Sequence, residues 1–251
     1  MKCRYLVLFA VLAFTSLQTT QARAISLGSA DSFALLGGAG VTNTGSSVIN
    51  GNVGSAPTPA VTGFPPGVVT NGTLYLAADT VTDQAHTDLI AAWTEAQSAP
   101  GGSTGPADLG SANLVPGIYT YAAAAPWTAG TLTLDAGGNP NAEWIFQIGS
   151  SLTTPGAATV ALINGASPDH VFWQLGSFAS IGATNTFAGN ILAQTDITLG
   201  GGTLDGRALA ITGTVAITAA ENVNAVIPEP GTFLLLGSGL VSLCALKKRA
   251  S

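Results

Sequence analysis

Small side chains that carry a hydroxyl or a methyl recur in the second half of the sequence, along short segments expected to be extended. Successive side chains of an extended segment point to opposite faces, so the apolar residues between them take the inward positions. The outward set is then Thr131, Thr133, Ser151, Thr153, Ser180, Thr198, Thr214 and Ala216. Regularly spaced hydroxyls and methyls can hold water in an ordered arrangement, because each hydroxyl both donates and accepts hydrogen bonds.

Residues suited to acid–base or nucleophilic catalysis are sparse. The two histidines, His86 and His170, have no serine or cysteine partner in a recognisable motif, so we assign both to solvated or structural roles. Asp196 and Asp205 belong to different corners, and Arg207 is expected to pair locally with an acid. The sequence holds no phosphate-binding loop or metal-ligand motif. It therefore predicts a protein that is not an enzyme and binds no metal or cofactor.

Most of the outward set must be positioned by a repeat that runs through residues 151–220, and Thr131 and Thr133 continue the set before that repeat. Its later steps are 17 or 18 residues long, since Gly189 precedes Gly206 by 17 and Ile197 precedes Val215 by 18. A unit this short, rich in β-branched residues, alanine and glycine, cannot close its own core and must stack on its neighbours. Three short strands and three corners per repeat would give a β-helix. Stacked coils lie about 4.8 Å apart, so the outward set becomes a flat ladder with almost no charge.

A flat ladder of this kind can match a plane of ice, with methyls shaping the water layer and hydroxyls pinning it. The alternative is purely structural, because threonine favours strands and outward threonine is common on β-solenoids. A face free of bulges favours ice binding. Protrusion of Phe178 or Asp196 from the face favours the alternative.

One segment departs from the strand pattern and predicts a helix over residues 80–97. Glycine and proline are absent there, and Asp79 or Thr80 can cap its start. The residues expected on its buried face are Val81, Ala85, Leu89, Ala92 and Ala96. We expect the helix to lie along the stack and to cover the outward leucines of another face, Leu162, Leu192 and Leu209.

Charge and cysteine divide the chain into a middle and two ends. Between Ile25 and Ile227 the only basic residue is Arg207, against twelve acidic residues. Such a surface repels phosphate backbones, so nucleic acid is excluded as a partner. The two cysteines, Cys3 and Cys244, lie in the ends, so the middle part has no disulfide framework.

Both ends carry targeting patterns. Residues 1–24 combine a basic start, an apolar run and the small-residue site Ala22-Arg23-Ala24, which is typical of a secretory signal. Residues 227–251 hold Pro228, Glu229 and Pro230, a short apolar stretch and a basic end. This order resembles the PEP-CTERM sorting tail of Gram-negative bacteria. The resemblance implies an exosortase-type processing enzyme, transient anchoring in the inner membrane and delivery to the cell surface. The alternatives are an N-terminal membrane anchor and a C-terminal helix docked on the domain.

The middle part, residues 25–226, resembles the large microbial ice-binding family with the DUF3494 domain. The matching stretches, in order, include LGSADSFALLGGAGVTNTGSSVINGNVG, TGFPPG, LVPGIYTY, GTLTLDAGGNPNAEWIFQIGSSLTT, VFWQLGSFASIGATNTFAGNILA and GRALA. The resemblance implies an irregular right-handed parallel β-helix, triangular in section, with one long α-helix packed alongside. It also implies ice binding through one flat β-face. A Thr-Ala/Gly-x-Thr/Asn pattern found in some members fits once, at residues 128–131.

Together these patterns predict a secreted or cell-surface protein that binds ice and inhibits ice recrystallisation through its Thr/Ser/Ala face. The expected partners are an ice crystal surface, the sorting machinery in transit, and exopolysaccharide. The alternative is a surface adhesion or matrix protein of the same fold without ice affinity. A polysaccharide-acting enzyme would need clustered carboxylates in a groove.

Overall fold

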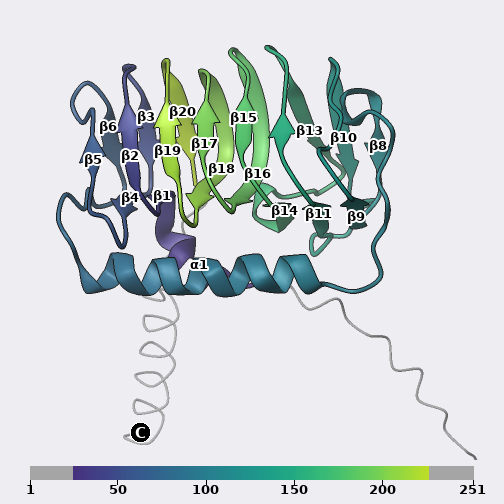
Figure 1. Ribbon diagram of the computed structural model, residues 1–251. Coiled ribbons are helices and arrows are strands. Elements are labelled where there is room, and N and C mark those ends of the chain that lie inside the picture. The colour runs from purple at the N-terminus through teal and green to yellow at the C-terminus, as the bar shows by residue number, and fades with distance from the viewer. Residues whose placement is uncertain (1–24, 226–251) are drawn as a thin grey trace, which may run out of the picture.

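Residues 25–225 form one stack of coils with a helix along its side. The computed structural model describes these residues, and the predicted signal and sorting segments lie outside them. Figure 1 shows α1 (Thr80–Ser98) running along the stack. Short 3-10 turns within the described residues are η1 (Gly28–Ser32), η2 (Leu109–Ser111) and η3 (Pro168–His170). The predicted mostly-β fold, with parallel coils and one long helix, is confirmed.

One side of the stack is a six-stranded parallel sheet, and we call its outer surface the threonine face. Its strands, in spatial order, are β12 (Leu152–Thr153), β15 (Ala179–Ile181), β17 (Ile197–Leu199), β19 (Thr214–Ile217), β2 (Gly40–Asn43) and β5 (Val61–Thr62). Pairing between neighbouring strands continues through the sheet without a register shift. The sheet therefore offers a regular surface.

The other two sides belong to one fourteen-stranded parallel sheet. Its strands are β1 (Phe33–Gly37), β3 (Val48–Asn50), β4 (Asn52–Ser55), β6 (Val68–Thr70), β7 (Ser103–Thr104), β8 (Asn113–Leu114), β9 (Gly117–Tyr121), β10 (Thr131–Asp135), β11 (Trp144–Ile148), β13 (Thr159–Ile163), β14 (Val171–Leu175), β16 (Asn185–Ala193), β18 (Gly202–Ala210) and β20 (Glu221–Asn224). The nine-residue strands β16 and β18 pass from one side to the other. They do so at Gly189 and Gly206, whose positive φ angles of 110° and 147° turn the backbone at the corner. The first half of β16 pairs with β13, and the second half pairs with β14.

The order of coils in space differs from their order along the chain. The first coils, which contain β1 to β6, stack on the last one: β1 pairs with β18, β2 with β19, and β3 with β20. Figure 1 shows this as purple strands beside yellow-green ones. Helix α1 then carries the chain along the stack, and the remaining coils are laid down back towards the start. The amino-terminal coils thus form one end of the stack, and the carboxy-terminal coil is their direct neighbour.

The interior of the stack is a continuous apolar column. At its centre Phe146 and Trp173 stack with ring centroids 4.0 Å apart, and Phe187 lies 5.1 Å from Trp173. The two strands that carry Phe146 and Trp173 align residue by residue, with Gln147 opposite Gln174. The similar segments EWIFQI and VFWQLG therefore lie on adjacent coils. Identical side chains pack well on successive coils because equivalent positions repeat at the spacing between strands.

Helix α1 begins where the sequence predicted and covers the side formed by β1, β11, β14 and the second halves of β16 and β18. The Asp79 carboxylate accepts a hydrogen bond of 2.8 Å from the Val81 backbone N–H, which caps the first turn. The buried positions on the helix are Thr82, Ala85, Leu89, Ala92 and Ala96. They form one apolar cluster with Leu192 and Leu209, so the predicted cover over these two leucines is confirmed.

Two details of the helix prediction are wrong. Val81 is 42% exposed, and Thr82 takes its place because that side chain packs against the bare backbone of Gly54 and donates to Asp79 O at 2.7 Å. Leu162 lies on a different side of the stack, where β13 pairs with β10 and the side chain packs on the interior. Leu162 therefore points inward and not outward as predicted, because it lies on the same side of β13 as the buried Val160.

Candidate functional site

Six outward side chains form one unbroken column across the threonine face. Strand register places them on successive coils in the order Thr153, Ser180, Thr198, Ala216, Thr42 and Thr62. We call this set the threonine column. The residues before them in each strand point inward, and Leu152, Ile197, Val215 and Val41 are fully buried there. Apolar alternation thus fixes the column at the surface.

The structure brings together four of the eight predicted face residues in this column: Thr153, Ser180, Thr198 and Ala216. Ser151 and Thr214 lie on the same face in the adjacent outward position, one step outside the column. Thr131 and Thr133 do not belong to the face, because β10 pairs with β8 and β13 in the larger sheet. Their placement was wrong because a Thr-Leu-Thr-Leu pattern is equally suited to any outer side of the stack.

Sequence reasoning missed Thr42 and Thr62, which extend the column by two coils. They come from the amino-terminal coils, whose pairing with β19 joins residues more than 170 positions apart. The only available signal was the short Val-Thr unit at both positions, which resembles Leu152-Thr153 and Ile197-Thr198. Such a unit predicts a strand, but it does not predict which other strand pairs with it.

Hydroxyls of the column differ from those at the corners in their hydrogen bonding. At the corners, Thr44 and Thr218 donate to the carbonyls of Ile217 and Leu199, both at 3.2 Å, and so fasten one coil to the next. No hydrogen bond within the described residues uses a hydroxyl of Thr42, Thr62, Thr153, Ser180 or Thr198. These five hydroxyls are therefore available to water.

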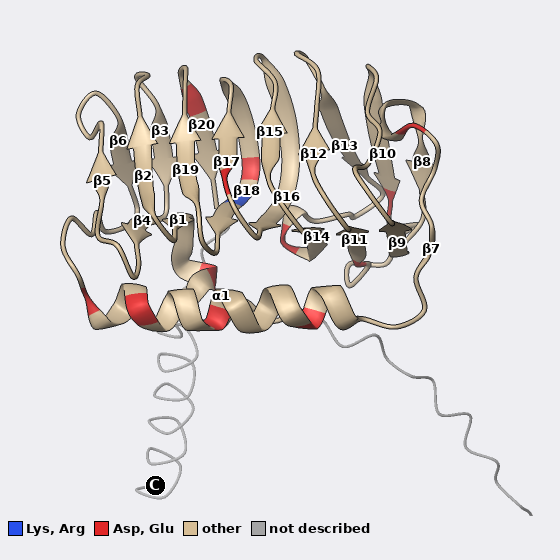
Figure 2. Ribbon diagram, in the orientation of Figure 1, with Lys and Arg blue, Asp and Glu red and all other residues tan. Residues whose placement is uncertain are grey.

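One edge of the threonine face is less regular than the column. Phe178 and Asp196 occupy successive coils just before β15 and β17, and Phe178 is 41% exposed. The Asp196 carboxylate accepts a hydrogen bond of 2.8 Å from the Thr214 backbone N–H, so it is held against the next corner. In Figure 2 the six strands of the face carry no charged residue, and the acidic residues lie on α1, at corners and on strands of the larger sheet such as β18 and β20.

The spacing of the column suits a layer of hydrogen-bonded water. Adjacent coils lie about 4.8 Å apart, and alternate outward residues of one strand lie about 6.7 Å apart. Tetrahedrally coordinated water with O···O contacts of about 2.75 Å places second neighbours about 4.5 Å apart. Bound waters on successive coils can therefore take positions close to those they hold in an ice-like layer, and the β-sheet keeps those positions fixed.

A neighbouring side of the stack carries a second run of threonines, Thr131, Thr159, Thr186 and Thr203. This run is less regular, since β13 and β16 share a single aligned pair. The next outward position on that side includes Asp205, whose carboxylate accepts from the Asn224 side chain at 2.9 Å. The threonine face is the more uniform and less charged of the two.

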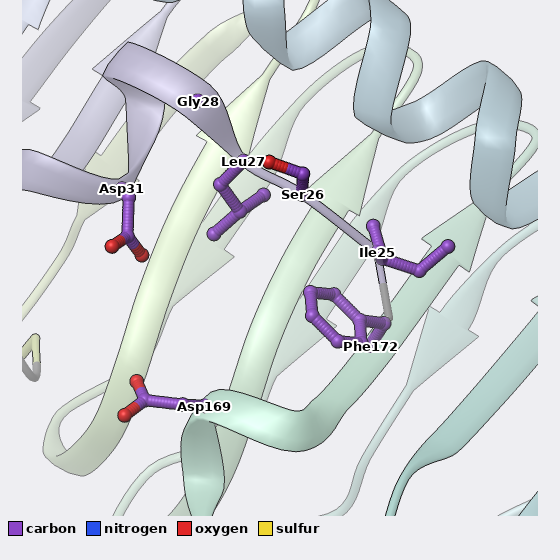
Figure 3. Close-up of a pocket in the computed structure, with 7 residues that line it drawn as sticks. All are labelled: Ile25, Ser26, Leu27, Gly28, Asp31, Asp169 and Phe172. Atoms are coloured by element: carbon purple, nitrogen blue, oxygen red, sulfur yellow. The ribbon is translucent and has the colours of Figure 1, made fainter. Parts of the chain in front are cut away.

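A pocket of about 250 Å³ lies away from the threonine face, between the amino-terminal segment and the sheet (Figure 3). Its carboxylates, Asp31 and Asp169, both pair with the buried guanidinium of Arg207, at 2.7 and 3.0 Å. Burial raises the pKa of Asp31, and Arg207 opposes that effect. Arg207 therefore does not pair locally as predicted, because its partners come from η3 and from the first residues of the domain.

His86 occupies a structural position, which is one of the two roles predicted for the histidines. His86 Nε2 lies 2.7 Å from the carbonyl oxygen of Ile211, which ties the helix to the stack. His170 is half-buried at the end of η3. The described residues contain no cluster of three or more metal-ligating side chains, and none of their helices is long and apolar enough to span a membrane.

Comparison with known proteins agrees with this geometry. Residues 35–223 match the model of a family described as ice-binding-like, and residues 226–249 match the PEP-CTERM protein-sorting motif. An ice-binding protein of Nostoc sp. (strain HG1) is 45% identical, over 98% of this chain and 96% of that protein. One of Colwellia sp. is 30% identical, over 79% and 82%.

Solved structures give the same result. The crystal structure of an ice-binding protein from an Antarctic biological consortium aligns with a TM-score of 0.76 and 38% identity, over 82% of this chain and 92% of that one. The DUF3494 domain of Shewanella frigidimarina ice-binding protein 1 aligns with a TM-score of 0.75 and 29% identity, over 81% and 98%. With the coil architecture, the family match and these relatives in agreement, the chain belongs to the ice-binding-like family.

Proposed function

We propose that this protein binds ice through the threonine face, with the threonine column as the centre of the contact. The observation that carries the proposal is the column itself: six small side chains in register, on strands without charge, with their hydroxyls unused by the protein. Relatives named ice-binding proteins support the same activity.

Binding would arise from many weak contacts held in fixed positions. Each threonine methyl excludes water on one side, and each hydroxyl completes a hydrogen bond on the other. The rigid backbone keeps the spacing, so little conformational entropy is lost when an ice plane adsorbs. Growth at the adsorbed patch then stops, which accounts for inhibition of recrystallisation.

The proposal places the activity outside the cell. Residues 1–24 act as the export signal, residues 25–226 as the ice-binding domain, and residues 227–251 as the sorting segment. Pro228, Glu229 and Pro230 mark the site read by an exosortase-type enzyme, with the tail held in the inner membrane during transit. Delivery to the cell surface would place the domain beside exopolysaccharide, where it meets ice first.

Replacing Ala216 with tyrosine tests the face. Ala216 lies between Thr198 and Thr42, so a bulky ring there lifts the ice plane off both neighbours. The matched control is Thr186→Tyr on the neighbouring side. We expect the concentration that halts ice recrystallisation to rise by about tenfold or more for Ala216→Tyr, a loss of about 1.4 kcal/mol. The control should stay within about twofold, because both changes are at the surface and spare the fold.

Three results would count against the proposal. Grain growth equal to buffer in the unmodified protein removes ice binding altogether. If both variants lose the same inhibition of recrystallisation, or if only Thr186→Tyr loses it, ice binding cannot be assigned to the threonine face. Circular dichroism and the melting temperature of each variant show whether a loss comes from unfolding.

A second function, adhesion to a surface matrix without ice affinity, is favoured by one observation. Phe178 and Asp196 at the edge of the face resemble an aromatic and carboxylate pair suited to contact with sugars. Sedimentation with purified exopolysaccharide, using Phe178→Ala as the variant, tests this function. Retained ice activity with lost polysaccharide binding would show that the edge and the column act separately.

A further inference from the structure

The first described residues pack into the groove between α1 and the sheet. Ile25 and Leu27 are 7% and 5% exposed, and they join the apolar cluster that holds the helix, which includes Phe172 and Ile145. Figure 3 shows Ile25 and Leu27 beside Phe172, with Ser26 and Gly28 along the same wall. Ser29 continues the segment, and its backbone N–H donates to the Asp88 carboxylate on α1 at 2.7 Å.

The backbone nitrogen of Ile25 faces a carboxylate. It donates to Glu143 Oε1 at 3.1 Å, across 118 positions of sequence. Glu143 is fixed in place because its own carbonyl accepts from the Gly117 N–H at 2.9 Å, at the start of β9. Burial raises the pKa of Glu143, and the hydrogen bond from Ile25 only partly offsets this effect. A neutral amide is a weak partner for a half-buried carboxylate.

The sequence places the predicted signal cleavage site directly before this nitrogen. Ala22 and Ala24 occupy the small-residue positions, so cleavage after Ala24 releases Ile25 as the first residue. Water adds across the Ala24–Ile25 peptide bond, the new carboxylate stays on Ala24, and the amine of Ile25 takes up a proton. The same nitrogen that now donates as an amide would then carry a positive charge.

We propose that export processing after Ala24 makes Ile25 the amino terminus, and that its ammonium group forms an ion pair with Glu143 which latches the amino-terminal segment between α1 and the sheet. Cleavage therefore creates the cation at the position where the folded domain holds the Glu143 carboxylate.

Charge balance around the site supports the pairing. The other titratable groups that act on Glu143 are Glu95 on α1 and His170 in η3. Arg207 is the only lysine or arginine between residues 25 and 225, and it is bound to Asp31 and Asp169. An ammonium on Ile25 would therefore add a second cationic group beside Arg207 to a domain with twelve acidic residues. Partial burial strengthens such a pair, because water screens it less.

The full chain, exported from a bacterial host, tests the proposal at two levels. Amino-terminal sequencing should give Ile25. The rate of acylation of the α-amine, measured by mass spectrometry, should then be lower than for an ordinary amino terminus and should rise at least about fivefold in Glu143→Gln. The reason is that the ion pair raises the amine pKa above its usual range of about 7.7–8.0. Asp83→Asn, an exposed change on α1, is the charge control and should leave the rate unchanged.

Stability gives an independent readout. Glu143→Gln should lower the melting temperature of the protein with a free amine by roughly 2–4 °C, and by clearly less once the amine has been acylated. A carboxylate that only accepted a neutral hydrogen bond would give the same loss in both forms. If Glu143→Gln does not fold, the pH dependence of acylation in the unmodified protein still gives the pKa of the Ile25 amine. That pKa then tests the proposal by itself. An amino terminus other than Ile25, an amine pKa in the ordinary range, or acylation rates equal with and without Glu143 would each overturn the proposal.

Discussion

Replacing Glu221 with glutamine should make the stability of the domain less dependent on pH. Glu221 begins β20, is 1% exposed, and lies between the coils that carry Gly202 and Ser47. Neither carboxylate oxygen has a hydrogen-bond partner of good geometry among the described residues. Burial raises the pKa of Glu221 to about 7, although Gly201 and Asn185 lie close enough to favour the anion slightly.

The sign of the effect follows from proton binding. The folded protein keeps the Glu221 proton up to about pH 7, whereas the unfolded chain releases it near pH 4.5. Between these values the folded state binds more protons than the unfolded state, so the free energy of unfolding falls as pH rises. Between pH 4.5 and pH 7 the free energy of unfolding falls by about 3 kcal/mol, and the fall is complete above pH 7. Glutamine keeps the size and polarity of the neutral acid and removes its titration.

Urea unfolding at pH 5 and pH 8 measures the effect. At pH 5 the two proteins should have nearly equal stability. At pH 8 Glu221→Gln should be more stable by up to about 3 kcal/mol, or on the order of 5–10 °C in melting temperature. Asp83→Asn removes an exposed charge of the same sign and should keep the slope of the unmodified protein. Equal slopes in Glu221→Gln and the unmodified protein would refute the reasoning, because the proton would then not be held in the fold.

Three further predictions concern the stability of the coils and of helix α1. Arg207→Met should cost about 3–5 kcal/mol in urea unfolding, because it leaves Asp31 and Asp169 without their cation; a loss under about 1 kcal/mol would contradict this. Gly206→Ala should prevent folding as judged by circular dichroism, since a Cβ there lies 2.1 Å from the Gly189 carbonyl oxygen; a native spectrum would be the contrary result. Asp79→Ala should cost about 1 kcal/mol through loss of the cap on α1, and unchanged thermal stability would argue against it.

Local patterns in the sequence were sufficient to predict the elements of this fold. The 17- and 18-residue steps appear as aligned pairs, with Gly189 on Gly206 and Ile197 on Val215. The predicted helix, residues 80–97, matches Thr80–Ser98. These features depend on alternation, helical spacing and capping, which are properties of residues close in sequence.

Contacts between distant coils were not predictable in the same way. Thr131 has the same local pattern as Thr198, yet the two lie on different sides, because the side is set by the number of residues between corners. Glu221 is buried because it lies on the same side of β20 as Val223, although a carboxylate is not expected in the interior. Arg207 finds Asp31 only because the first coils stack on the last.

The threonine column shows how the proposed ice-binding face can form without a strict sequence motif. A coil contributes to the column if its outward position holds a small residue, and threonine, serine and alanine all satisfy that condition here. The column also crosses from Ala216 to Thr42, where the last coil meets one of the first through the four aligned pairs of β19 and β2. The area of the face therefore depends on closure between the two parts of the chain as well as on the repeat. On the proposed function, a substitution that loosens this junction would shorten the contact with ice while leaving every residue of the column unchanged.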